Sequence, residues 1–338
     1  MRLVYVVNGL GVCGGVRIIV EHLNRLGARG HEVALLTTDG STELSWLPCH
    51  FEIAGARSAR GEELYQAADA LVATEWSTAP FVAYGSSVSQ RRFYFVQMRE
   101  SLFARYGSWR DQAESTYRLP LKPITISRWL KRFLEEEYGH RDVPLIPNGV
   151  NLAAFYPDPS LPRAPGLRRV LVEGHEANAA KNVADAFRVI ENLRARGQQL
   201  EVYGFNQVGP KHYPYDRFFL RPDQDLIRQL YSSSDLLLKT TRFEGRPLPQ
   251  IEAMACGCPV VTTDMLALDD VAPEGLPPNA LVSAVDDIAA MVGHAESLLR
   301  DEATRQSLIA RARDYVRREL DWEPIVSRLE DVLNGPLS

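Results

Sequence analysis

Residues 243–261 read FEGRPLPQIEAMACGCPVV, which predicts a loop, then a helix over Leu248–Ala255, then a buried strand over Val260–Thr262. Pro247 favours a helix start because its fixed φ suits the first turn, where its missing N–H would have had no partner. A helix followed at once by a short, wholly apolar strand is typical of an α/β fold with parallel strands.

The same alternation of apolar strands and amphipathic helices continues on both sides of this stretch. In the second half of the chain we predict the strands Val170–Val172, Leu200–Tyr203 and Asp235–Lys239 and the helices Val183–Arg196 and Asp223–Tyr231. In the first half we predict the strands Leu3–Val7, Glu32–Thr37, Leu71–Ala73 and Phe93–Val96, with a helix over Arg17–Leu26. Each half therefore has the pattern of an open parallel sheet covered by helices.

A proline-rich connector, residues 157–166, separates the two halves. We therefore expect two facing Rossmann-like domains, residues 1–155 and 156–318, with a cleft where the carboxyl edges of their sheets meet. The tail over Asp301–Leu333 has a helical pattern, with a kink or break at Pro324. Its last part, residues 319–338, is expected to cross back and pack on the N-terminal domain.

Composition narrows the class of protein. With 338 residues, 45% of them hydrophobic, the chain can bury more than one core. Its net charge of −5 argues against nucleic-acid binding, which needs a strongly basic surface. Four scattered cysteines predict no disulfide framework and fit a reducing, cytoplasmic setting. We expect neither a secretory leader nor a membrane-spanning helix, so any membrane contact would be peripheral, at the inner face.

A glycine-rich motif follows the first predicted strand: Gly9, Gly11 and Gly14 match G-x-G-x-x-G, and Asp39 ends the second strand. On these features alone an NAD-dependent oxidoreductase is one interpretation. In a second interpretation, the backbone amides at the helix start, Gly14 and Gly15, bind a phosphate of the donor. A purely structural turn is the third.

Two glutamates, Glu244 before the helix and Glu252 inside it, lie where both could face one cleft. They resemble the paired-glutamate motif of family 4 glycosyltransferases, the group 1 type, whose fold is GT-B. By this resemblance, Glu244 contacts the transferred sugar and Glu252 the donor ribose. The helix start between them would offer amides and a positive dipole end to a diphosphate. The donor contacts expected there come from Gly245, Arg246, Pro247 and Leu248, although the family commonly has Phe-Gly at the positions of Arg246 and Pro247.

Two further segments match the same family. Gly174 and His175 follow the strand at residue 170, with Lys181 downstream. The resemblance assigns Lys181, and His175 where relatives carry Arg, to neutralising the departing diphosphate. Gly204, Phe219 and Arg221 fall where relatives place the nucleobase. The catalytic candidates are thus Glu244, Lys181 and His175.

A basic, aromatic band, residues 91–132, carries ten Lys or Arg against three acidic residues. It looks like a segment of rhamnosyltransferase-like family members. Because its loop follows a strand end, we expect it on the acceptor side of the cleft. Its positive charge could also attract an anionic acceptor or an anionic membrane surface. The acceptor-side candidates are Glu75, Trp76, Gln97, Arg99, Glu100 and Tyr106.

The resemblance implies transfer of a hexosyl or deoxyhexosyl unit from a nucleoside-diphosphate sugar to a hydroxyl acceptor, with retention and without a metal or other cofactor. The acceptor could be a glycan, a lipid-linked molecule or a small molecule. Three alternatives stay open: the NAD-dependent oxidoreductase, a non-catalytic relative that only binds sugar nucleotides, and a sugar-nucleotide epimerase.

Overall fold

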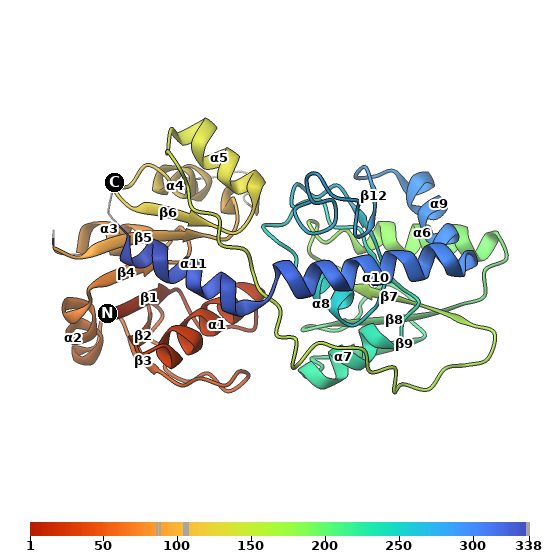
Figure 1. The fold of residues 1–338 in the computed structure, drawn as a ribbon, viewed down its shortest axis with the longest axis horizontal. Coiled ribbons are helices and arrows are strands. Elements are labelled where there is room, and N and C mark those ends of the chain that lie inside the picture. Colours follow the sequence, from red (N-terminus) through yellow and green to blue (C-terminus); the bar gives the residue numbers. More distant parts are fainter. Residues whose placement is uncertain (86, 88, 104–107, 336–338) are drawn as a thin grey trace. The chain divides into compact units, whose positions relative to one another are not determined.

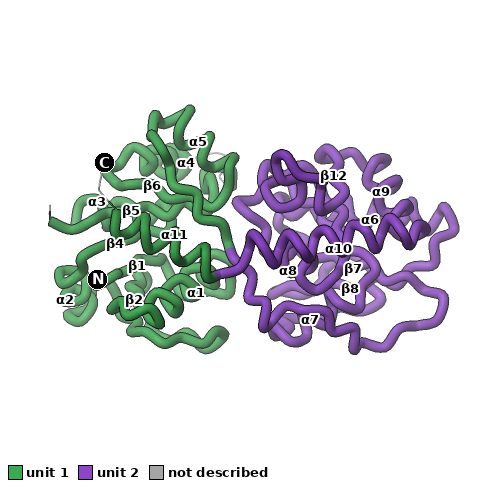
Figure 2. Tube along the Cα trace, viewed as in Figure 1, with its two compact units in different colours: residues 1–148, 323–338 green, residues 149–322 purple. Residues whose placement is uncertain are grey.

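The computed structural model describes residues 1–85, 87, 89–103 and 108–335. The chain forms two compact units (Figure 2). Unit 1 contains residues 1–148 and 323–338, and unit 2 contains residues 149–322. The C-terminal segment thus returns to the unit in which the chain began.

Unit 1 is an open parallel sheet of six strands in the order β3-β2-β1-β4-β5-β6, flanked by helices (Figure 1). The carboxyl ends of all six strands lie at one edge because every pairing is parallel. Its elements are β1 (Arg2–Val7), α1 (Gly14–Ala28), β2 (Glu32–Thr37), β3 (Glu52–Gly55), α2 (Ala59–Ala67), β4 (Ala70–Ala73), α3 (Ala79–Gly85), β5 (Arg91–Val96), the 3₁₀ helix η1 (Glu100–Phe103), α4 (Ser108–Thr116), β6 (Lys122–Thr125), α5 (Arg128–Tyr138) and the C-terminal α11 (Trp322–Asn334).

Unit 2 repeats the design with a second parallel sheet of six strands, in the order β12-β11-β10-β7-β8-β9. The two sheets confirm the predicted α/β class, in which crossover helices cover both faces. Its elements are β7 (Arg168–Glu173), α6 (Val183–Ala195), β8 (Leu200–Asn206), β9 (Arg217–Leu220), α7 (Gln224–Ser232), β10 (Leu236–Lys239), α8 (Leu248–Ala255), β11 (Val260–Thr263), β12 (Leu281–Ser283), α9 (Ile288–Arg300) and α10 (Glu302–Glu319).

The central strands are apolar on both faces, as sheets sandwiched between helices require. All four residues of β4 and of β10 are buried. In unit 2, α6 and α9 lie beside each other and share one hydrophobic core with the strands, including Val189 and Ile190 of α6 and Met291 of α9. Lys239, the last residue of β10, is therefore a charged side chain at the end of an otherwise apolar strand.

Two sequence expectations differ from the structure. β8 runs on to Asn206, so Gly204 lies inside the strand and not in a loop after Tyr203. A Cβ on Gly204 would come within 2.2 Å of the Tyr215 ring, which explains the glycine there. The tail breaks between Glu319 and Trp322, while Pro324 sits in the first turn of α11, where a missing N–H breaks no helical hydrogen bond.

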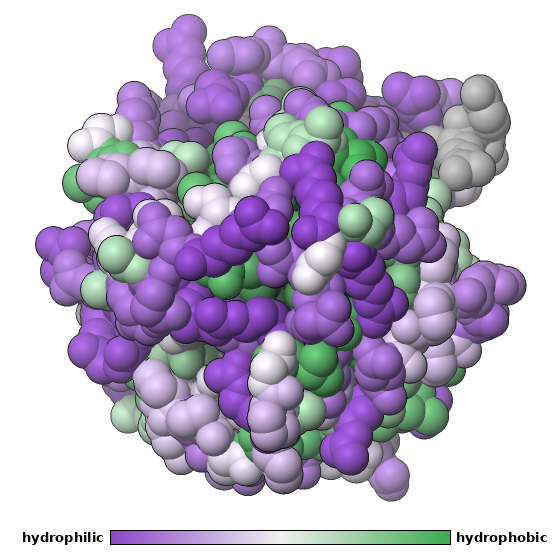
Figure 3. Space-filling model, turned by 90° about the vertical axis from the view of Figure 1, so that its right-hand side faces the viewer, coloured by the Kyte–Doolittle hydropathy of each residue, from purple (hydrophilic) through white to green (hydrophobic). Residues whose placement is uncertain are grey.

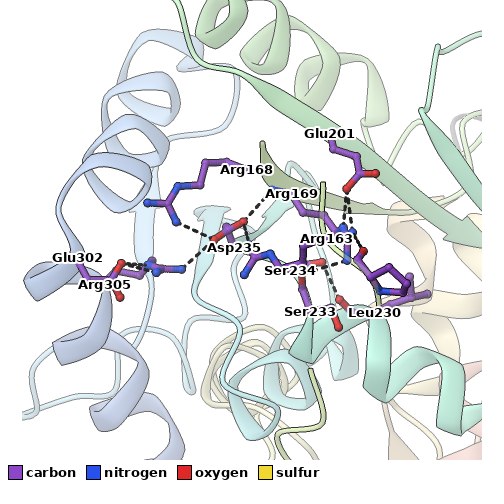
Figure 4. Close-up of polar contacts among 11 residues, drawn as sticks. Arg163, Arg168, Arg169, Glu201, Leu230, Ser233, Ser234, Asp235, Glu302 and Arg305 are labelled. Carbon is purple, nitrogen blue, oxygen red and sulfur yellow. Dashed lines mark hydrogen bonds and ion pairs between the residues drawn. The ribbon is translucent and has the colours of Figure 1, made fainter. Parts of the chain in front are cut away.

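Within unit 2, one of the contacts that hold the connector is made by the buried carboxylate of Asp235 (Figure 4). Arg163 and Arg168 from the connector side, and Arg305 from α10, all form ion pairs with it. The backbone N–H of Arg169 also donates to Asp235 Oδ2, at 2.8 Å. Although burial opposes ionisation, Arg163, the Arg169 N–H and Arg168 keep the pKa of Asp235 below its ordinary value.

On the face drawn in Figure 3 hydrophilic side chains predominate, and hydrophobic ones are scattered between them. Among the helices of the described residues, none is both long enough and apolar enough to cross a membrane.

Candidate functional site

Four charged side chains meet at the carboxyl edge of the unit 2 sheet. β7 and β10 are parallel neighbours, with Val172 opposite Leu238. The next residues along these strands are Glu173 and Lys239, whose Oε2 and Nζ lie 2.8 Å apart. Lys181 Nζ lies 2.6 Å from Glu244 Oε1, and Lys239 Nζ lies 3.0 Å from the same oxygen. We call these four residues the charge cluster.

Backbone hydrogen bonds hold together the two loops that carry Lys181 and Glu244. The N–H of Arg242 donates to the carbonyl of Ala180 at 2.8 Å, and Thr240 Oγ1 donates to the carbonyl of Asn182 at 2.7 Å. The N–H of Glu244 donates to Met265 O at 3.2 Å, which ties its loop to the segment after β11. The 2.6 Å ion pair is therefore supported by both backbones and does not depend on the side chains alone.

Gly174 brings the backbone close to Lys181. Its φ of +145° is rarely adopted by L residues, and a Cβ there would lie 3.2 Å from the Cβ of Lys181. Asn206 also holds this turn, because its Nδ2 donates to the Gly174 carbonyl at 3.0 Å. The glycine predicted as a donor contact thus has a structural reason, which is the position of the lysine.

The alternation of charges fixes the ionisation of the cluster. Burial alone would raise the pKa of Glu244, but Lys181 and Lys239 lower it to about 2. The same two ammonium groups hold the pKa of the buried Glu173 below its ordinary value. Burial would lower the pKa of Lys181, but the two glutamates raise it by more, so the pKa lies above its ordinary value. Glu173, Lys181 and Glu244 are therefore charged at neutral pH, and Glu244 is a very weak base.

The rest of the paired-glutamate segment is buried. α8 begins at Leu248, as predicted, and Glu252 is 4% exposed within it. One edge of the Arg246 guanidinium, Nε and Nη2, faces the carboxylate of Asp270, with Nε 2.8 Å from Oδ2. Arg246, expected to face a donor phosphate, is held by this internal ion pair instead.

The remaining donor-side candidates lie in two places. His175 is half-buried in the turn after Gly174, and its carbonyl accepts from the N–H of Asn178. Phe219 is on the outermost strand β9. Arg221, which follows that strand with a φ of +50°, is exposed and donates from Nε to the Gln207 carbonyl at 3.0 Å.

In unit 1, the predicted acceptor-side residues occupy the carboxyl edge of the sheet. Glu75 Oε1 accepts from the N–H of Asn8 at 2.6 Å, which joins the loops after β4 and β1. Glu100 Oε2 accepts from the N–H of Trp76 at 2.7 Å. Gln97 lies beside Gly15, in the first turn of α1. Burial, with a smaller contribution from Glu75, raises the pKa of Glu100 to about 8.

Two stacked indoles and an arginine engaged in ion pairs also lie at this edge. The indole of Trp76 stacks on that of Trp109 in α4, with ring centroids 6.0 Å apart. Arg99 forms ion pairs with Glu114 and Glu137, both at 3.0 Å, and its guanidinium lies over the Phe133 ring. Tyr106, the other predicted member, is outside the described residues.

Sequence reasoning did not single out Glu173, Lys239 or Trp109. For the first two a signal existed, because each ends its strand and follows three apolar residues. Across the described ranges, no group of three or more His, Cys, Asp or Glu side chains is arranged to hold a metal ion.

The turn at Gly9, which suggested a dinucleotide site, has a local explanation. A Cβ on Gly9 would meet the Asp39 carboxylate at 2.3 Å. Asp39 accepts hydrogen bonds from the N–H and the hydroxyl of Ser41, at 2.9 and 2.6 Å. The first glycine of the motif is thus required by packing between the loops after β1 and β2.

Comparison with known proteins gives matches in both sequence and fold. Residues 216–315 match the family described as "Glycosyl transferases group 1". N-acetyl-alpha-D-glucosaminyl L-malate synthase of Bacillus anthracis is 32% identical over 117 residues, which is 35% of this chain and 30% of that protein. The matched part is therefore about a third of this relative's length.

Solved structures match over the whole chain. Sucrose-phosphate synthase from Thermosynechococcus elongatus gives a TM-score of 0.81 at 15% identity, covering 99% of this chain and 98% of that one. Anabaena HepE in complex with UDP-glucose gives 0.75 at 12% identity, covering 98% and 99%. Residues 216–315 are thus similar to the group 1 glycosyltransferases, and the whole chain shares the GT-B fold of these solved structures.

Proposed function

We propose that this chain is a glycosyltransferase that moves a hexosyl or deoxyhexosyl unit from a nucleoside-diphosphate sugar to a hydroxyl group. The observation that carries the proposal is the charge cluster at the carboxyl edge of the unit 2 sheet, the edge at which open α/β sheets bind ligands. The match over residues 216–315 includes Glu244 and the whole of α8.

The charges of the cluster suit a sugar diphosphate. Lys181 is 23% exposed, so its ammonium can reach a phosphate oxygen, and phosphate gains negative charge as the sugar leaves. Glu244 is 19% exposed and ionised, so its free lone pairs can accept hydrogen bonds from sugar hydroxyls. The amides at the start of α8 are further candidates for the diphosphate.

The chemistry follows from what these groups can and cannot do. The acceptor oxygen forms a bond to the anomeric carbon while the bond from that carbon to the phosphate oxygen breaks. With a pKa of about 2, Glu244 cannot efficiently remove the hydroxyl proton. We infer that the proton passes to the leaving phosphate oxygen, with attack on the leaving-group face, which retains the anomeric configuration. No metal is needed in this scheme, because Lys181 supplies the positive charge.

The acceptor is assigned to the carboxyl edge of the unit 1 sheet. Stacked indoles such as Trp76 and Trp109 offer a flat apolar face to a sugar ring or an aglycone. Glu75 and Glu100 supply hydrogen-bonding oxygens beside it. Arg99, the one cation among the six predicted acceptor-side residues, is already paired with Glu114 and Glu137. We therefore infer an uncharged, polyhydroxylated acceptor.

A two-part experiment tests the function. A thermal-shift panel of UDP-, GDP- and TDP-sugars, with NAD as the control ligand, should show a rise in melting temperature for one nucleotide sugar and none for NAD. Nucleotide release from that sugar is then measured with neutral and anionic sugars as acceptors, and the anomeric configuration of the product is read by NMR.

The outcomes separate the alternatives. Acceptor-dependent release of nucleotide supports the transferase. A chain that binds the donor but releases nothing with any acceptor would be the non-catalytic relative. Product formed from the donor with no acceptor would indicate an epimerase, and stabilisation by NAD alone would reopen the oxidoreductase.

A further inference from the structure

Lys239 is the most buried member of the charge cluster. The proposed donor site gives it no direct role. Its side chain is 0% exposed, so it cannot itself reach a bound ligand without rearrangement. Its Nζ lies 2.8 Å from Glu173 Oε2 and 3.0 Å from Glu244 Oε1. A single Lys181–Glu244 pair would already be neutral, so the chain buries an additional pair at considerable desolvation cost.

The second pair has a clear geometric origin. Glu173 and Lys239 are the last residues of the neighbouring parallel strands β7 and β10. They come directly after Val172 and Leu238, which are paired in the sheet. Their backbones are therefore part of the sheet and cannot shift independently. Lys181, in contrast, lies in the loop before α6 and is 23% exposed. One ammonium is fixed by the sheet, and the other is on a flexible stem with access to solvent.

The two lysines beside Glu244 can therefore have different roles, one binding the donor and the other compensating the charge of Glu244. An ammonium that binds a diphosphate must weaken its contacts with its present carboxylate partners. Lys181 Nζ lies 2.6 Å from Glu244 and 3.9 Å from Glu173. If it were the sole cation beside both glutamates, releasing it would leave two uncompensated, partly buried carboxylates, which is unfavourable. With Lys239 in place, both keep a cation.

We propose that Lys239 and Glu173 are positioning residues of the donor site, which hold Glu244 and keep it compensated while Lys181 transfers its ammonium to the donor diphosphate. This inference rests on the proposed function. It makes Lys181 the mobile cation and Lys239 the fixed one, and it gives the two buried residues opposite effects on donor binding.

The test uses Lys239→Met and Glu173→Gln, which keep approximate size and remove one charge each. Both variants break a buried pair, so both should lower the melting temperature. Their effects on donor binding should differ in sign. Lys239→Met leaves one ammonium for two carboxylates, so Lys181 is retained and the donor KM should rise at least about tenfold. Glu173→Gln frees Lys181, so the donor KM should fall.

In the double variant Glu173→Gln/Lys239→Met, Lys181 has one carboxylate to compensate instead of two, so its donor KM should lie between those of Lys239→Met and the wild type. The double variant also keeps the test valid if Lys239→Met alone does not fold. All assays are run well below the melting temperature of each variant. Binding of the nucleoside diphosphate chosen from UDP, GDP and TDP is measured in parallel by calorimetry, without turnover.

A merely structural role predicts something else: melting temperatures fall for both single variants while the donor KM and the calorimetric affinity of the folded protein do not change. That result, or a rise of KM in both single variants alike, would overturn the inference and leave the proposed function standing. A wild type that binds none of the three diphosphates, nor their sugars, would instead remove the proposed function and this inference with it.

Discussion

Lys181 Nζ lies 2.6 Å from Glu244 Oε1, although the two residues are 63 positions apart in the sequence. An unpaired charge at this depth would be costly, so each residue is the reason the other can be ionised there. The pair contains two of the three predicted catalytic candidates, Glu244 for the transferred sugar and Lys181 for the departing diphosphate.

Glu244→Gln should reduce glycosyl transfer by about 10²–10³-fold, the range found when one electrostatic contact to a transition state is removed. The amide keeps the shape but removes the charge that holds Lys181. Initial rates of nucleotide release at saturating donor and acceptor measure the effect. Glu191→Gln, on the exposed surface of α6, is the matched control and should retain wild-type turnover. Equal rates in the two variants would exclude Glu244 from the mechanism.

Gly174→Ala should weaken donor binding through Lys181. The new methyl meets the Lys181 Cβ at 3.2 Å and also strains a φ of +145°. Gly197→Ala is the control, since its φ is +85° but no atom lies within 4 Å of the added Cβ. Each variant should lose about 1–2 kcal/mol of unfolding free energy from backbone strain. Only Gly174→Ala should raise the donor KM, and a parallel rise in both variants would contradict this role.

Trp76→Ala and Trp109→Ala should each raise the acceptor KM, because each removes half of the stacked pair. Loss of one aromatic contact is worth about 0.5–1.5 kcal/mol beyond the buried area, so the rise should be about threefold or more. The donor KM should not change. Tyr84→Ala, which removes an aromatic side chain that is 74% exposed, serves as the control. An altered donor KM with an unaltered acceptor KM would place the indoles on the wrong substrate.

Glu100→Gln should flatten part of the pH dependence of stability. The folded pKa of Glu100, about 8, lies above the ordinary value of 4.5, so the folded protein binds a proton more tightly than the unfolded chain. This contribution to stability is present below pH 4.5 and is lost as pH rises through 8. Between pH 5 and 8 the melting temperature of the wild type should therefore decline more than that of the variant. Parallel curves would show that Glu100 is ionised in the folded state.

Asp235→Asn should destabilise unit 2, because Arg163, Arg168 and Arg305 then lose their shared carboxylate (Figure 4). Breaking a buried ion pair costs about 3–5 kcal/mol, measured here by urea denaturation. Asp314→Asn, which removes an exposed pair with Arg318 in α10, should cost no more than about 1 kcal/mol. Comparable losses in both variants would mean that burial of Asp235 has little energetic effect.

The sequence by itself determined the elements and their order. Apolar strands alternating with amphipathic helices predicted both parallel sheets, and α8 was predicted to the residue because Pro247 and Gly257 mark its ends. It also located Glu244 and Lys181, because the motifs that contain them are short stretches that can be recognised in the sequence. Short edge strands such as β9 and β12 were missed, since three or four residues carry too little periodicity to distinguish them from loops.

The tertiary structure alone decided which charges meet. Whether Lys239 lies beside Glu173 depends on the register of two strands more than 60 residues apart, and no local pattern encodes that register. It decided likewise that Arg246 faces Asp270 and that Arg99 faces Glu114. The physical reason is that a buried charge selects its partner by distance and desolvation in three dimensions, whereas the sequence records only that the charge exists.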